Sequence, residues 1–204
     1  MSEDQGKLDD LLTDIRARRI CMDAPGRRGP LPHDPRPIIR GTGDAKLCIA
    51  GQAPGTRVHA SGIPFDDPSG DRLRDWMGLD RDAFYDETRL AIVPMGFCFP
   101  GLDANGGDLP PRSECATAWH ARVFESLPNV ELVLVIGAYA QKWHLGKARQ
   151  KTVTETVAHW RNHGPRYLPM PHPSWRNTGW LKKHPWFETD VLPHLRSEVS
   201  RLMV

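Results

Sequence analysis

The sequence lacks the features of a membrane protein or a disulfide-stabilised protein. None of the apolar runs in its 204 residues approaches ~18 residues, the length of a membrane-spanning helix. The first five residues are polar and acidic, which does not match a secretory signal. The four cysteines lie far apart along the chain, so a dense disulfide framework is excluded. We therefore expect a cytoplasmic protein without a membrane partner.

Strong charge is also lacking, because the formal net charge is only +2. That value does not identify a nucleic-acid-binding protein, but the basic residues are unevenly distributed. They form two groups: Arg16, Arg18, Arg19, Arg27, Arg28, Arg36 and Arg40, and then Arg161, Arg166, Arg176, Lys182 and Lys183. Groups of this kind can follow a phosphate backbone. For any one of these residues, a solvated surface charge is the simpler interpretation.

Short apolar runs alternate with segments of helical periodicity. The runs predict strands at 47–50, 90–95, 132–136 and 167–170. Helices are predicted at 4–19, 68–78, 82–85, 112–127, 138–145, 153–161, 175–183 and 185–202, the last broken near Pro193. Loops are predicted at 25–37, 52–68 and 96–111.

Short apolar strands separated by helices are typical of a parallel sheet that is covered on both faces. We therefore expect the α/β class, with a three-layer α/β/α sandwich around a central four-stranded parallel sheet. The length fits a single domain over residues 1–204. Residues 1–45 would form a lead-in made of one helix and a Pro- and Arg-rich loop.

A glycine-containing loop, Gly51-Gln52-Ala53-Pro54-Gly55, follows the first predicted strand directly. Its two glycines would let the backbone approach a ligand, and Pro54 would stiffen the loop. Open α/β sheets bind ligands at the carboxyl ends of their strands. Taken alone, these five residues favour an ordinary strand-to-loop turn.

Two further stretches complete a recognisable pattern. Gly62-Ile63-Pro64-Phe65 leads into Asp67-Pro68-Ser69-Gly70-Asp71, and His172-Pro173-Ser174-Trp175-Arg176-Asn177 follows the last predicted strand. Together with Gly51–Gly55, these stretches resemble the motifs of the uracil-DNA glycosylase superfamily, from about Arg16 to the C-terminus. The spacing from Gly51 to Phe65 is similar to family 4 enzymes. The stretches Asp67–Leu73 and His172–Thr178 are more similar to family 5.

The resemblance implies the α/β/α fold and a DNA repair glycosylase. Such an enzyme flips uracil out of DNA, hydrolyses its N-glycosidic bond and leaves an abasic site. The implied partners are therefore uracil-containing DNA and the abasic-site DNA product, and we expect a monomer. The competing hypothesis is a catalytically weak or inactive superfamily member that binds uracil-containing or abasic DNA. The arginine groups argue against an enzyme that acts on free nucleosides.

The resemblance also implies the residues of the site. His172 would donate an N–H to the leaving uracil anion, and Phe65 would stack on the base. The remaining base-binding candidates are Gly51, Gln52, Ala53, Pro54, Gly55, Met95, Gly96, Phe97 and Asn177. Backbone groups of residues 95–97 would read the base, since Pro94 stands where several families carry Asn. Ser174, Trp175 and Arg176 would contact DNA, with Arg176 either filling the gap left by the flipped base or contacting a phosphate.

The water-activating residue is the ambiguous part of this site. Ala53 stands where family 1 enzymes carry an Asp. The acidic positions of family 4 are held here by Gln52, Val58 and His59. Asp67, placed like an aspartate of family 5, is the first candidate and His59 the second. Asp67 is equally suited to cap the helix predicted from Pro68, and both roles can coexist because a cap leaves one carboxylate oxygen free.

Family 4 enzymes also hold a [4Fe–4S] cluster on four cysteines. Cys21, Cys98 and Cys115 match three of those ligand positions, but Arg18 stands at the fourth. A cluster with three thiolates would need another ligand or an open iron. We therefore expect three ordinary buried cysteines, and neither a metal nor a cofactor.

Overall fold

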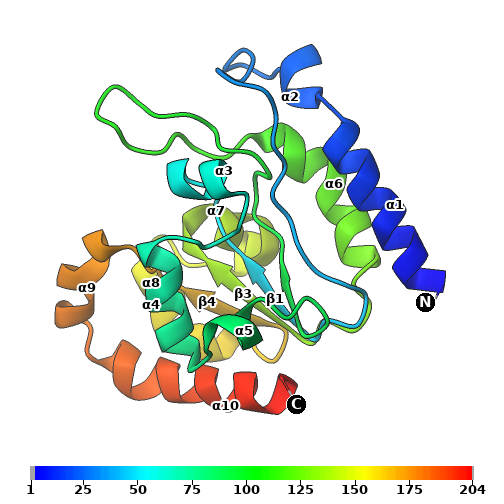
Figure 1. The fold of residues 1–204 in the computed structure, drawn as a ribbon. Helices are drawn as coiled ribbons and strands as arrows, with labels where there is room; N and C mark the ends of the chain where they lie inside the picture. Colours follow the sequence, from blue (N-terminus) through cyan, green and yellow to red (C-terminus); the bar gives the residue numbers. More distant parts are fainter. Residues whose placement is uncertain (1–2, 204) are drawn as a thin grey trace.

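A parallel sheet forms the centre of the computed structural model, which describes residues 3–203. Within these residues the sheet has four strands in the order β2-β1-β3-β4, and all pairs are parallel (Figure 1). The strands are β1 (Leu47–Ala50), β2 (Leu90–Ile92), β3 (Leu132–Ile136) and β4 (Tyr167–Met170). Leu47 in the inner strand β1 pairs with Leu90 on one side and Leu132 on the other. The predicted parallel sheet is confirmed.

Helices account for most of the chain between the strands. The α-helices are α1 (Glu3–Ala17), α2 (Ile20–Asp23), α3 (Thr56–Ser61), α4 (Pro68–Met77), α5 (Arg81–Phe84), α6 (Ser113–Glu125), α7 (Gly137–Leu145), α8 (Val153–Ala158), α9 (Thr178–Lys183) and α10 (Leu192–Leu202). Short 3₁₀ turns follow α7 and α8 and precede α9, at Gly146–Ala148, Trp160–His163 and Trp175–Asn177. None of the described helices is long and apolar enough to cross a bilayer.

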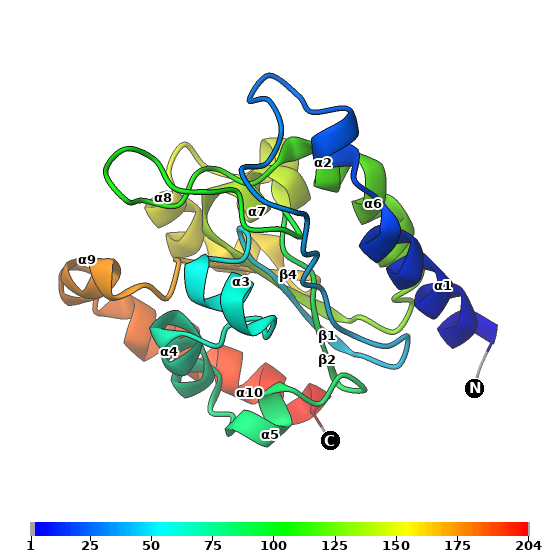
Figure 2. The ribbon, with the colours of Figure 1, turned by 45° about the horizontal axis from the view of Figure 1, so that its top comes forward.

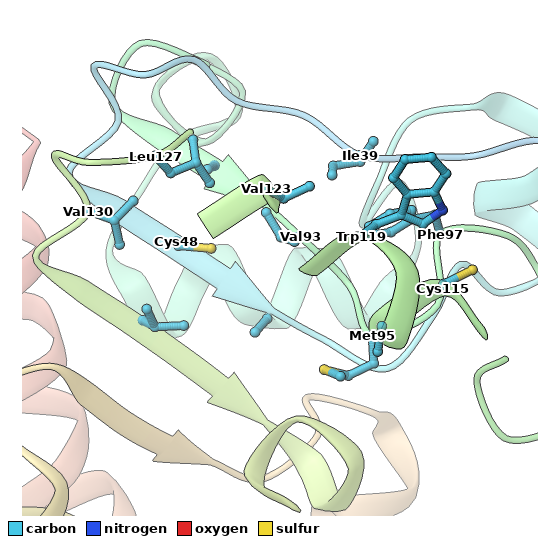
Figure 3. Packing of buried hydrophobic residues seen from close by; sticks show 14 of the residues in the cluster. Ile39, Cys48, Val93, Met95, Phe97, Cys115, Trp119, Val123, Leu127 and Val130 are labelled. Carbon is cyan, nitrogen blue, oxygen red and sulfur yellow. The ribbon is translucent and has the colours of Figure 1, made fainter. Parts of the chain in front are cut away.

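These helices cover both faces of the sheet (Figures 1 and 2). Cys48 and Ala50 of β1 pack into a core shared with α1, α6 and α7, whereas Leu47 and Ile49 pack into a second core with α4, α5, α8 and α10. Figure 3 shows the first core, where α6 carries Trp119 and Val123 over the sheet. Two apolar layers on opposite faces make the predicted three-layer α/β/α sandwich.

The second strand ends earlier than predicted. Regular pairing stops at Ile92. The chain nevertheless continues along β1: the Val93 amide donates to the Ile49 carbonyl at 2.9 Å, and the Met95 amide donates to the Gly51 carbonyl at 2.9 Å. This irregular continuation ties the segment after β2 to the loop after β1.

The helices differ from the prediction in two regions. The helix α2 lies between the predicted helix at 4–19 and the predicted loop at 25–37, where no element was predicted, and α3 lies within the predicted loop at 52–68. The predicted break near Pro193 is wrong, because a π-helical turn at Phe187–Val191 runs directly into α10. Pro193 lies in the first turn of α10, where a missing N–H costs little.

Candidate active site

A cavity of about 500 Å³ lies at the carboxyl edge of the sheet. The loops after β1, β2 and β4 line it, together with the long loop that precedes α6. Its lining includes Gly51, Gln52, Ala53, Pro54, Gly55, Phe65, Asp67, Ile92, Pro94, Asp108, His172, Ser174, Trp175 and Arg176. Residues far apart in the sequence therefore meet at the edge where open α/β sheets bind ligands.

Phe65 lies in this cavity with an unusual backbone. Its φ is 57°, and it is the one non-glycine residue with positive φ in the described part of the chain. A left-handed conformation costs a non-glycine residue roughly 1–2 kcal/mol. The ring packs edge-to-face on Phe84 and lies against Gly51, where a Cβ would be in ordinary van der Waals contact with its Cζ atom at 3.4 Å. Strained backbone conformations of this kind are typical of functional sites.

The start of α4 holds the Phe65 turn in place. Gly70 approaches it so closely that a Cβ there would lie 1.8 Å from the Phe65 carbonyl oxygen. Asp67 caps the helix, since its Oδ1 accepts from the Gly70 amide at 2.8 Å. Because Asp67 also lines the cavity, its second oxygen is free to face a ligand. The predicted N-cap is therefore present, and it does not consume the whole carboxylate.

His172 enters the cavity from the loop after β4. The Asn177 amide donates to the His172 carbonyl at 2.7 Å, and Arg72 of α4 donates to the Ser174 carbonyl at 2.8 Å. Burial lowers the pKa of His172, although the charges of Asp67 and Asp108 oppose that change. The imidazole is therefore neutral at neutral pH and can donate one N–H. Asn177 does not line the cavity; it fixes the loop that carries His172.

Asp108 is the residue that the sequence analysis missed. The turn before it is shaped by Asp103, which accepts from the amides of Asn105 and Gly107, and Leu102 pairs with Asp108 across the resulting hairpin. Part of the Asp108 side chain stays exposed, yet the surrounding chain desolvates the carboxyl group and raises its pKa. A protonated His172 and the Arg176 guanidinium lower that pKa, whereas Asp67 raises it, so all three groups lie close enough to act on this carboxyl group.

No sequence pattern marked Asp108, because it lies in a Gly- and Pro-rich loop without a motif. Only the path of that loop, back across the end of β1, brings it to the cavity. The Asp108 Oδ2 atom would lie 3.4 Å from a Cβ at Gly55, which places it against the first motif.

Besides Asn177, four of the predicted site residues lie outside the cavity. The amides of Met95 and Gly96 donate to the carbonyls of Gly51 and Gln52, at 2.9 and 3.0 Å, and so are not free to read a base. Phe97 is buried and stacks on His120. His59 does not line the cavity; its ring lies 4.3 Å from that of His33, between centroids. Pro94, rather than residues 95–97, forms the wall of the cavity after β2.

The mouth of the cavity is basic and partly aromatic. Trp175 is 70% exposed, and the Arg176 guanidinium lies over its ring at 5.8 Å from the centroid. Arg57, also exposed, lines the same cavity from α3. These side chains can reach the backbone and the bases of a nucleic acid.

The three cysteines do come together, but they do not suit an iron–sulfur cluster. The side chains of Cys21 and Cys98 are hydrogen-bonded, and Cys115 lies close enough to Cys98 to raise its pKa. Burial raises the pKa of Cys98 to about 12 and that of Cys115 to about 11 in the metal-free chain. Arg18 supplies no fourth thiolate, and the described residues contain no group of three side chains arranged to hold a metal ion.

A cavity at the carboxyl edge of a parallel sheet, lined by an aromatic ring, a histidine and two carboxylates, is typical of α/β proteins that bind a ligand at that edge. Comparison with known protein families agrees with this class. The model of the uracil DNA glycosylase superfamily matches residues 39–196. The chain belongs to the uracil-DNA glycosylase superfamily. Membership supports a hydrolase of the glycosylase type that acts on DNA in repair.

Proposed function

We propose that this protein removes uracil from DNA by hydrolysing the N-glycosidic bond of a flipped nucleotide. The observation that carries the proposal is a single cavity that holds Phe65, His172 and two carboxylates, Asp67 and Asp108. A base stacked in DNA cannot reach such a cavity unless the nucleotide is extruded. The basic and aromatic mouth supports DNA as the substrate rather than a free nucleoside.

The chemistry follows from the charges that develop. As the bond between C1′ and the base nitrogen breaks, the sugar becomes cationic and the uracil anionic. The neutral His172 donates an N–H to the anionic base, and Phe65 stacks on its face. A carboxylate of Asp67 or Asp108 stabilises the cationic sugar and orients a water molecule that attacks C1′. The proton released by that water passes to the same carboxylate.

Asp108 is the better placed of the two to take the proton. One oxygen of Asp67 already accepts a hydrogen bond from the Gly70 amide. We therefore assign Asp67 the role of a negative charge that stabilises the cationic sugar. The raised pKa of Asp108 brings its basicity closer to that needed for proton transfer.

Base recognition in this proposal depends on Gln52. Ile92 and Pro94 make the wall after β2 apolar, and the Pro94 carbonyl lies 3.1 Å from the His120 Nε2 atom. Gln52 is half-buried and lines the same cavity, and its amide offers both a donor and an acceptor to a base edge.

The second candidate function is binding of uracil-containing or abasic DNA without turnover. The non-acidic side chains of Gln52 and Ala53 in the cavity favour it, whereas Asp67 and Asp108 favour hydrolysis. A uracil-containing oligonucleotide incubated with the protein and then with alkali separates the two. We expect strand cleavage at the uracil. A stable shifted band without cleavage would instead support the binding module.

A further inference from the structure

A second cavity, of about 740 Å³, lies beside the first. Pro94 lines the first cavity and the next residue, Met95, lines the second; likewise Asp108 lines the first and Pro111 the second. Met95 lies just past the carboxyl end of β2 (Figure 3). The start of α6, the α7 residues Tyr139, Lys142 and Trp143, and the loop at residues 26–28 complete the walls. The segments around residues 94–95 and 108–111 therefore separate two cavities at one edge of the sheet.

The second cavity presents aromatic surface. In the described part of the chain, the large hydrophobic side chains that remain exposed are Leu102, Tyr139, Trp143 and Trp175. Two of these line the first cavity, and Tyr139 and Trp143 line the second, with 39% and 47% of their surface exposed. Trp143 packs against the ring of His120, at 5.6 Å between centroids in an edge-to-face arrangement. One side of Trp143 is thus held by α6 while the other stays available.

The charge around these aromatics is positive. Arg27, Arg28 and Lys142 are exposed and line the cavity. Glu114, the single acidic residue among its described lining residues, is already neutralised, since it accepts from Arg112 at 3.1 Å and from the Gly26 amide at 2.7 Å. The Arg28 guanidinium donates to the Pro110 carbonyl at 2.7 Å, which holds it at the boundary between the two cavities.

We propose that the second cavity binds an unpaired nucleotide of the same DNA strand that enters the active site. The base stacks on Trp143 and Tyr139, and the phosphates lie against Arg27 and Lys142. Aromatic faces combined with basic side chains are the means by which proteins hold single strands without reading their sequence. The claim that this nucleotide belongs to the strand entering the active site rests on the proposed function. The claim that the cavity stacks an unpaired base does not. Since a paired base cannot stack there, the protein should prefer single-stranded or locally opened DNA.

The test uses undamaged DNA, so its result is independent of uracil excision. Binding of a fluorescent oligothymidylate of about 12 nucleotides is compared with binding of a duplex of the same length, by fluorescence anisotropy. The variants are Trp143→Ala and Lys142→Ala, with Trp143→Phe retaining an aromatic face. Lys147→Ala is the matched control, because Lys147 is exposed just after α7 but lines neither cavity.

We expect Trp143→Ala to weaken single-strand binding by about 5- to 100-fold, the effect of losing one stacked base. Duplex binding should change little, and Trp143→Phe should restore most of the loss. Lys142→Ala should reduce the salt dependence of binding, whereas Lys147→Ala should not. If a uracil substrate is excised, kcat at saturating DNA should stay unchanged in Lys147→Ala.

Three results would overturn the proposal. Trp143→Ala could bind the single strand as tightly as the parent, or lose duplex binding equally. Thymidine monophosphate could compete as strongly as the oligonucleotide, which would make the cavity a free-nucleotide site. A protein that never excises uracil but needs Trp143 to hold single strands would refute the proposed function and leave this second site intact.

Discussion

At the scale of single residues, the neutral state of His172 has a direct consequence for activity. Burial lowers its pKa below the ordinary value of 6.5, so the imidazole donates without carrying a charge. Excision should therefore persist as pH rises from 6 to 8, where an imidazolium would be lost. His172→Ala should lower the excision rate by ~10²-fold or more, because it removes the donor to the leaving anion. Single-turnover rates across pH measure both; an unchanged rate in the variant would remove His172 from the mechanism.

The two carboxylates can be separated by conservative substitutions. Asn caps a helix as well as Asp does, so Asp67→Asn should leave the stability of the protein nearly unchanged. Loss of its charge should still slow excision by ~10²-fold or more. Asp108→Asn should slow excision similarly. It should also abolish the acidic limb of the pH–rate profile, which in the parent lies at a higher pH than an ordinary aspartate would give, because the pKa of Asp108 is raised.

The matched control for these variants is Asp103→Asn, whose carboxylate shapes the same hairpin without lining the cavity. A parent-like excision rate in Asp67→Asn would reduce Asp67 to a helix cap. A parent-like rate in Asp108→Asn would leave Asp67 as the sole candidate.

Phe65 should act on the flipped base alone. Removing one stacking partner costs roughly 1–3 kcal/mol, so Phe65→Ala should weaken the binding of uracil-containing DNA by about 5- to 100-fold. Binding to undamaged DNA should stay near the parent value, because phosphate contacts are made by other residues. Phe65→Tyr, which keeps the ring, is the control. An equal loss of binding to both DNAs would indicate a folding defect and reject the stacking role.

At the scale of elements, the contact between α4 and the Phe65 turn is the one most sensitive to an added side-chain atom. A Cβ at Gly70 would lie 1.8 Å from the Phe65 carbonyl, so Gly70→Ala must move either the helix or the turn. We expect a loss of ~1–3 kcal/mol in the free energy of unfolding, together with loss of excision. Gly6→Ala in α1 is the control, since nothing lies within 4 Å of its added Cβ and Ala favours a helix. Urea unfolding measures the free energy of unfolding of both variants. Equal changes in the two would show that α4 and the Phe65 turn are not closely packed at Gly70.

At the scale of the whole molecule, two histidines between α6, α7 and β4 limit stability in acid. Burial lowers the pKa of His120 to about 4 and that of His144 to about 3, and in the latter case His120 and Arg166 add to the decrease. The His120 Nδ1 and His144 Nε2 atoms have no hydrogen-bond partner within the described residues. Both rings must therefore be neutral in the folded state.

Since the folded pKa values lie below the unfolded value of about 6.5, the unfolded chain binds more protons in acid. Stability should be fully present above pH 6.5 and should decline toward pH 4, by up to ~1.4 kcal/mol per pH unit for each histidine. His144→Phe should remove one of these contributions and flatten the decline. Thermal unfolding between pH 7 and pH 4.5 measures it; identical slopes for the variant and the parent would contradict the assignment.

The sequence by itself determined the layered fold and half of the site. Apolar strands such as Leu132–Ile136, alternating with helices, are typical of a covered parallel sheet. The motifs around Gly51 and His172 directly follow strands, and the motif around Phe65 directly precedes the start of α4. Local chemistry was also sufficient to predict Asp67 as the N-cap of α4.

Only the tertiary structure decided which loop residues reach the cavity, because that depends on the paths of the loops. Asp108 reaches the cavity because its hairpin folds back over the first motif, a long-range contact without any local pattern. The amides of Met95 and Gly96 are bonded to the loop after β1, so they cannot serve a ligand. His59 was near the motif in sequence, yet the turn of α3 directs it toward His33. Strands and caps follow from neighbouring residues, whereas the occupants of a cavity depend on which distant segments the fold brings together.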